Sequence, residues 1–198
     1  MLLNGVLNAV DPRSDNRSDI LDAQERYAGR FTTTSRNHNR WRNGSANLNL
    51  KHTFDSTGRE FTADLDYARY QNRVDQNFVT QFYDAQDNPI RRNNLIGDLG
   101  GSLTIASVKG DYTHPMGKRG KVEAGFKSSL VTADNDVRFF NRVDNVNVPD
   151  PDQSNHFRYR ENINAVYANY HREWAGLSLQ LGLRGEQTVA DELERLAI

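Results

Sequence analysis

The chain has 198 residues, of which 36% are apolar and 26% charged, with 25 basic and 26 acidic side chains. This length suits one domain or at most two, and the balanced charge argues against a nucleic-acid partner, which needs a basic surface. The absence of cysteine excludes disulfides, thiolate metal sites and a cysteine nucleophile. The mean hydropathy of −0.80 is low, but an aromatic content of 10% favours a folded chain over a disordered one.

Residues 1–43 carry the weakest pattern, and we expect a weak strand near 2–10 followed by a long polar loop. The first residues lack a basic segment ahead of an apolar run, so no secretory signal peptide is expected. No apolar run anywhere in the chain approaches the length of a membrane-spanning helix.

Residues 44–188 alternate apolar and polar side chains with the period of two that marks a β-strand. Short turns that contain glycine divide this region into three antiparallel hairpins. The predicted strands are 44–54 and 60–72, 101–114 and 121–133, and 157–171 and 177–188. In one strand the parity changes between Ile105 and Val108, which predicts a β-bulge near Ala106.

The two sides of these strands differ in polarity. Because strand period assigns alternate residues to opposite faces, one side should carry Leu48, Leu50, Leu65, Phe126, Leu179, Leu181 and Leu183. The other side is charged, and we expect its members to face a watery lumen: Asp64, Asp66, Lys121, Glu123, Lys127 and Arg184.

The connections alternate between short turns and long polar segments near 71–101 and 133–156, both of which we expect to contain strand extensions. Residues 78–83 followed by 84–89 are expected to form a ribbon with a turn at its tip. This rhythm is typical of transmembrane β-barrels, in which short turns lie on the periplasmic side and long loops outside. Aromatic residues beside the short turns fit an interfacial girdle, although they also cap hairpins in soluble β-proteins: Phe54, Phe61, Tyr112, Tyr170 and Trp174. Residues 189–198 are predicted to be a short helical tail outside the barrel.

Motifs for chemistry are absent from the sequence. No nucleophile elbow, phosphate loop or zinc-protease motif is present, so we expect neither an enzyme nor a cofactor. The five histidines lack ligand spacing, and no metal site is expected. Carboxylates at Asp134, Asp136, Asp150 and Asp152 suit calcium by their oxygen content, but without the spacing of a calcium loop they are most simply a solvated loop.

Six segments resemble a known family: 51–60, 62–67, 109–115, 123–129, 157–170 and 179–186. Together they are similar, over residues 40–188, to the outer-membrane β-barrel segment of Bacteroidetes TonB-dependent receptor-like proteins. The resemblance implies a large barrel of about 22 strands, closed by a plug, in the outer membrane of a Gram-negative cell. It further implies uptake of an iron chelate, vitamin B12 or a glycan, driven by the TonB–ExbB–ExbD complex.

The same resemblance implies the partners: outer-membrane lipid, a plug, the remaining barrel strands and, through the full-length protein, the TonB complex. Six predicted strands are too few for such a barrel, so we expect this chain to be an internal piece of a longer protein. The alternative is a soluble β-sandwich acting as an adhesin or glycan-binding module, with Phe139, Phe140, Tyr83 and Arg91 as loop contacts. A sandwich buries one face of each sheet, whereas a barrel exposes its apolar face to lipid.

Overall fold

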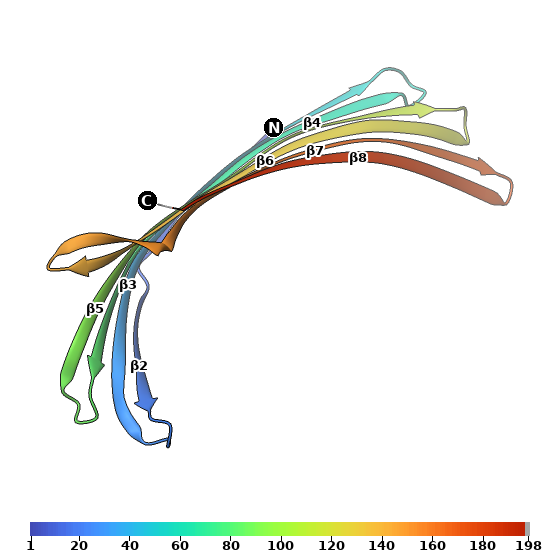
Figure 1. Ribbon diagram of the computed structural model, residues 1–198. Coiled ribbons are helices and arrows are strands. Elements are labelled where there is room, and N and C mark those ends of the chain that lie inside the picture. The colour runs from blue at the N-terminus through green and yellow to red at the C-terminus, as the bar shows by residue number, and fades with distance from the viewer. Residues whose placement is uncertain (197–198) are drawn as a thin grey trace.

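A computed structural model describes residues 1–196, which form one antiparallel sheet without a helix. Figure 1 shows long strands that curve together into a twisted arc. The strands are β1 (Leu2–Val10), β2 (Arg13–Leu21), β3 (Tyr27–Thr53), β4 (Glu60–Tyr83), β5 (Pro89–Pro115), β6 (Gly120–Val143), β7 (Val146–Trp174) and β8 (Leu177–Leu196). Within residues 1–196 there is no helix that could cross a membrane.

The strand order is β1-β3-β4-β5-β6-β7-β8, and β2 also pairs with β3. Strands β1 and β2 lie end to end along the same edge of β3 and are separated only by Asp11 and Pro12. At this break the backbone N–H of Asn37 donates to the carbonyl oxygen of Pro12 over 3.0 Å. The pair therefore acts as one kinked edge strand, and β8 forms the opposite edge of the described sheet.

The predicted all-β meander is confirmed, and each of the six predicted strands lies within an observed one. Sequential neighbours from β3 to β8 pair antiparallel, as short turns require. The observed strands are longer than predicted, at 20 to 29 residues each. A strand of 24 residues rises about 80 Å, well beyond the apolar band of about 25 Å that a membrane barrel needs.

The long connections are mostly strand, which confirms the predicted strand extensions, including the ribbon over 78–83, and makes them longer than expected. Strands β4 and β5 continue as a ribbon to a tip at residues 84–88, and β6 and β7 meet at residues 144–145. Residues 13–21 and 27–43, predicted as loop, pair with each other and with β4. A polar sequence is compatible with this outcome because the backbone ladder supplies the hydrogen bonds and both faces of a projecting ribbon are wet.

The tail prediction is also wrong within the described residues. Residues 189–196 extend β8 and pair with residues 155–162 of β7. Because β7 continues outward as a ribbon, its free backbone groups can be satisfied by this extension. Residues 197–198 of the predicted tail lie outside the described residues.

The predicted bulge near Ala106 is absent. The registers of β5 with β4 and with β6 both run without a shift past Ala106. The parity change between Ile105 and Val108 has another cause, because apolar side chains move from one face of the sheet to the other along the strand. Ile105 lies beside Val131 on one face, whereas Val108 lies beside Leu65 on the other.

The described sheet has no packed interior. Ala165 is the single buried hydrophobic residue in the described part of the chain, and 30 large apolar or aromatic residues are exposed. A sandwich buries one face of each sheet against a second sheet, and the described residues form only one. The alternative of a soluble β-sandwich is therefore wrong for this chain.

The turn between β3 and β4 is organised by the carboxylate of Asp55. Its oxygens accept a hydrogen bond from the backbone N–H of Thr57 over 2.9 Å and one from Nε of Arg59 over 2.7 Å. Gly58 adopts a φ of 94°, in the left-handed region that glycine enters at least cost. Hydrogen bonds from the Thr57 hydroxyl and then from Arg59 lower the pKa of Asp55 from 3.8 to about 2.

Replacing Asp55 by asparagine is expected to destabilise this hairpin at neutral pH, because a charged acceptor is lost from the turn. The carboxylate has a lower pKa in the folded state than in the unfolded state. Its contribution is therefore full above about pH 4 and lost as pH falls toward 2. Urea unfolding midpoints of the full-length protein and its D55N variant, both in phosphatidylcholine vesicles, should differ at pH 6 and converge near pH 2. Equal midpoints at pH 6 would show that Asp55 contributes nothing.

Candidate functional site

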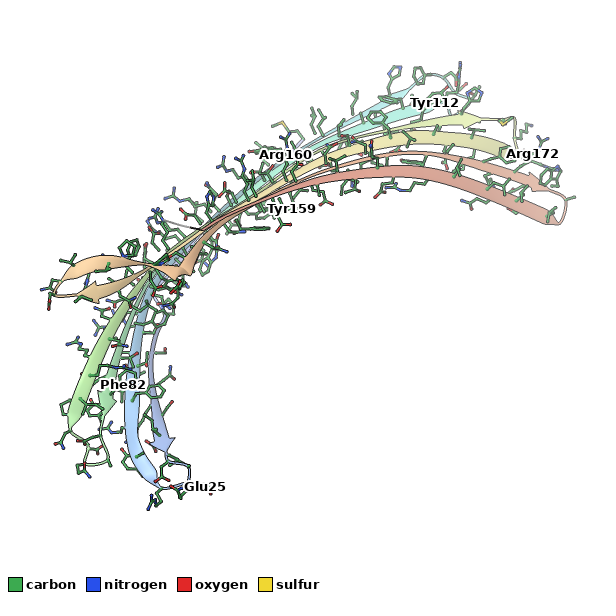
Figure 2. All side chains as sticks on the ribbon, viewed as in Figure 1. Glu25, Phe82, Tyr112, Tyr159, Arg160 and Arg172 are labelled. Atoms are coloured by element: carbon green, nitrogen blue, oxygen red, sulfur yellow. The ribbon has the colours of Figure 1, made fainter. Side chains whose placement is uncertain are left out.

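The sheet has an apolar convex face, defined here as the face that carries Leu65 and Tyr112. Figure 2 shows Tyr112 on the outer side of the arc. The register places every residue of the predicted apolar set on this face: Leu48, Leu50, Leu65, Phe126, Leu179, Leu181 and Leu183. Leu183 is 79% exposed and Leu181 is 57% exposed. An apolar surface of this extent requires a nonaqueous environment or a partner.

The concave face, which carries Asp66 and Tyr159, is the polar side of the sheet. Figure 2 shows Tyr159 on the inner side of the arc. The register brings all six predicted lumen residues to this face: Asp64, Asp66, Lys121, Glu123, Lys127 and Arg184. That these six residues face a water-filled lumen remains a prediction.

Hydrogen bonds and ion pairs connect most of these concave side chains to neighbours. Asp66 accepts hydrogen bonds from the Asn47 amide over 2.5 Å and from the Ser107 hydroxyl over 3.1 Å. Nζ of Lys121 lies 2.7 Å from the Glu123 carboxylate. Because these charges are satisfied by partners within the sheet, they can line a wet surface at fixed positions.

The sequence prediction missed a second concave group around Asp111. Nζ of Lys109 lies 2.6 Å from this carboxylate, and the Tyr167 hydroxyl donates to it. Lys109 lies directly opposite Lys127, and both line a depression of about 390 Å³ with Arg184. The alternation of Lys109 and Asp111 with Val108 could have revealed the group, but the assumed bulge left the parity of that strand open.

Aromatic rings gather at the short-turn end of the convex face. The rings of Phe54 and Tyr112 pack edge to face with centroids 6.0 Å apart, and His52 contacts Phe54 at 4.6 Å. The register adds Phe61, which is opposite Tyr112, and Tyr170 two strands further on. This is the arrangement of an aromatic girdle at the border of an apolar band.

Beyond the other border of the apolar band, the convex face becomes charged. A chain of ion pairs, here called the ion-pair belt, crosses four strands. It contains contacts of 2.7 Å from Arg40 to Asp75 and 3.0 Å from Arg73 to Asp98. It consists of Arg40, Asp75, Arg73, Asp98, Arg138 and Asp136.

The carboxylates considered for calcium have other partners in the structure. Asp136 pairs with Arg138 at 3.2 Å, and Asp134 lies 2.8 Å from Nε2 of His156. Asp150 accepts hydrogen bonds from Asn141 and Gln153. No group of three or more metal-binding side chains gathers within the described residues.

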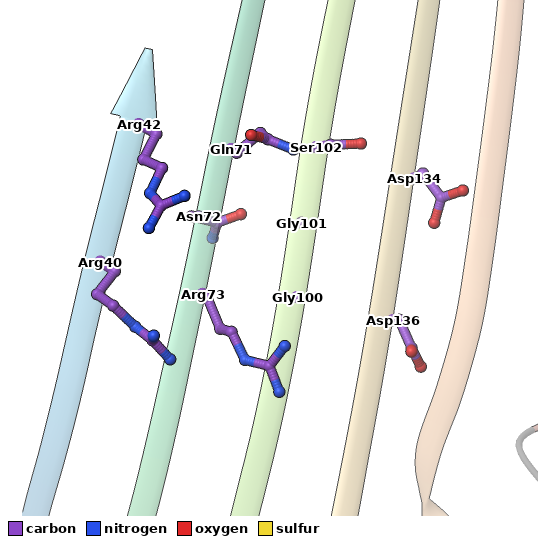
Figure 3. A pocket seen from close by; sticks show the side chains of 10 residues that line it. All are labelled: Arg40, Arg42, Gln71, Asn72, Arg73, Gly100, Gly101, Ser102, Asp134 and Asp136. Carbon is purple, nitrogen blue, oxygen red and sulfur yellow. The ribbon is translucent and has the colours of Figure 1, made fainter. Parts of the chain in front are cut away.

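A shallow depression of about 440 Å³ opens beside the belt. Figure 3 shows Arg40 and Arg42 from β3 on one side of it and Asp134 and Asp136 from β6 on the other. On β5 between them, Gly100 contributes no side chain and leaves the backbone bare.

The tip of the β4–β5 ribbon is held against β3 by charged and aromatic contacts. Arg30 donates to Asp87 over 2.7 Å and lies 4.1 Å from the ring centre of Tyr83. Arg91 lies over Phe82 at the same distance. The hydrogen bond from Arg30 holds the pKa of Asp87 below its usual value. Of the loop contacts proposed for an adhesin, Tyr83 and Arg91 therefore lie at this tip, and Phe139 and Phe140 lie on β6 instead.

An antiparallel sheet with an apolar convex face, a polar concave face and an aromatic border defines the wall of a membrane β-barrel. Residues 52–193 match the outer membrane protein beta-barrel family. The chain belongs to this family, and its place is the outer membrane. No curated protein matches the chain.

Proposed function

We propose that this chain is part of the wall of a TonB-dependent outer-membrane receptor that takes up a scarce nutrient, such as an iron chelate, vitamin B12 or a glycan. The observation that carries the proposal is the division of the sheet into an apolar convex face and a charged concave face. On this proposal the convex leucines contact lipid. Asp64, Asp66 and the Lys109–Lys127 pair line the water-filled interior.

The finer part of the proposal is supported by the resemblance of six segments to TonB-dependent receptor-like proteins. The two edges of the sheet, at β1–β2 and at β8, are open in the described structure and suit pairing with further barrel strands. The concave face would receive a plug, and the TonB complex would act through the full-length protein. On this proposal the chain is not an enzyme and uses no cofactor.

Ligand contact is assigned to the outer ribbons. The rings at the β4–β5 tip, Phe82 and Tyr83, are each covered by an arginine. Rings and guanidinium groups held in this way suit a sugar or a planar chelate, because they offer apolar area and hydrogen-bond donors together.

The test is nutrient uptake by cells that produce the full-length protein, with and without a working TonB complex. Uptake should require both the protein and TonB. Replacing Lys109 and Lys127 by glutamine should change the uptake rate, because these cations face the proposed path. The matched control is R36Q, an exposed arginine on the convex face. Uptake that is independent of TonB would contradict the proposal, as would equal effects of the concave and convex variants.

A further inference from the structure

The convex face carries four arginines without ion pairs at the outer border of the apolar band. They are called here the arginine row: Arg42, Arg69, Arg158 and Arg160. All four are exposed. Within the described residues, no ion pair or side-chain hydrogen bond connects any of them to a neighbour. Figure 2 shows Arg160 on the outer side of the arc.

The register defines how close the row lies to the apolar band. Tyr67 and Leu130 belong to the last mainly apolar level of the convex face. Arg69 follows Tyr67 by two residues, so it occupies the next position on the same face. Arg160 lies directly opposite Thr132, which follows Leu130 in the same way. On its other side Arg160 lies opposite Asp191 of β8, although no ion pair joins these two side chains, both of which the structure describes. The row therefore begins where the band ends.

The position of the row contrasts with that of the ion-pair belt. One level further out, Arg40 and Arg73 are paired with carboxylates, whereas the arginines nearest the band are not. Arg42 lies diagonally across from Arg69, because its direct partner on β4 is Gln71. Beside them, Nε of Arg40 is buried without a hydrogen-bond partner. The four cations at this level are therefore available to an anion from outside the chain.

We propose that the arginine row binds the phosphate groups of lipid headgroups in the outer leaflet that surrounds the barrel. The inference rests on the proposed contact of the convex face with lipid. A lipid whose tails cover Leu65 and Leu130 brings its headgroup to the level of Arg69 and Arg160. The planar guanidinium group matches the geometry of phosphate oxygens, and basic side chains beside a membrane favour anionic lipids.

Two arginine pairs make two separate contacts on this surface. Arg42 and Arg69 lie on β3 and β4, and Arg158 and Arg160 are neighbours on one face of β7. Between β4 and β7 lie three strand spacings of about 4.8 Å each, so the two pairs can engage different phosphates. The hydroxyls of Thr104 and Thr132 lie between them on the same level and can donate further hydrogen bonds.

The experiment uses the full-length protein inserted into phosphatidylcholine vesicles that contain a trace of spin-labelled lipid. The selectivity for labelled phosphatidic acid over labelled phosphatidylcholine is measured by electron paramagnetic resonance. The parent protein should prefer phosphatidic acid. This preference should fall about fivefold for each arginine removed in R42Q/R69Q and in R158Q/R160Q. Variant R42K/R69K should keep part of the preference, because the charge remains and the planar fork is lost.

The matched control is R36Q/R92Q, which removes two exposed arginines from the convex face beyond the arginine row. It should leave the preference unchanged. The inference is overturned if the inserted parent shows no preference, or if R36Q/R92Q lowers it as much as R42Q/R69Q. Vesicle flotation distinguishes failure of this inference from failure of the proposed function. A parent protein that does not float with vesicles would overturn the proposed function itself.

Discussion

Replacing Leu181 by arginine is expected to lower the free energy of unfolding in a bilayer by about 1 kcal/mol, the cost of an arginine near the border of the apolar band. Leu181 is 57% exposed on the convex face and lies directly opposite Tyr170 of the aromatic border. A guanidinium group at that depth must be desolvated or must pull water into the apolar region, and both outcomes cost free energy. The measurement is urea unfolding of the full-length protein in phosphatidylcholine vesicles, followed by circular dichroism.

The matched control is Q180R, one residue away on the same strand. Gln180 lies on the concave face, where the proposed environment is water, so the same substitution should have little effect. The difference between L181R and Q180R tests the face assignment apart from general effects of added charge. If Q180R destabilises the protein as much as L181R, the assignment of lipid to the convex face is wrong.

The chain by itself, outside detergent or lipid, is expected to aggregate and not to remain a stable soluble monomer. Both edges of the described sheet carry unpaired backbone groups, and such edges recruit further strands. The exposed stripe from Leu177 to Leu183 adds apolar area with no cover. In lipid the same open edges are costly, because their N–H and C=O groups find no water there.

Sedimentation of the purified chain in detergent-free buffer measures this behaviour. Large or polydisperse species are expected, and addition of detergent should reduce their size. The control is the full-length protein in the same detergent, in which, on the proposed function, further strands pair with β1–β2 and β8. A single monomeric species in buffer, with a cooperative unfolding transition, would contradict the expectation and would show that this sheet is stable with open edges.

The alternation of the chain predicted much of the sheet. Leu179, Leu181 and Leu183 share a face because strand geometry assigns alternate residues to opposite sides, whatever the strand pairs with. Short turns such as the one around Asp55 make sequential neighbours pair. The six strands, their order and the two-sided character therefore followed from local patterns. The same patterns brought the six predicted lumen residues to one face.

Longer-range features depended on the tertiary structure. Polar segments such as residues 71–77 have no apolar period, so only their pairing across the sheet shows that they are strands. The faces of Leu103 and Ile105 were misread for a related reason. A bulge and a change of apolar face give the same sequence pattern, and only the register with β4 and β6 separates them.

The different partners of Arg40 and Arg42 show the same dependence on register. In sequence Arg40 and Arg42 are equivalent, since they are two residues apart and share a face. Across the strand pair, Arg40 reaches Asp75 on β4 whereas Arg42 has only Gln71 opposite. The period of two in the sequence is sufficient to determine which side of the sheet an arginine occupies. Whether a carboxylate neutralises that arginine depends on which residues the long-range pairing brings beside it.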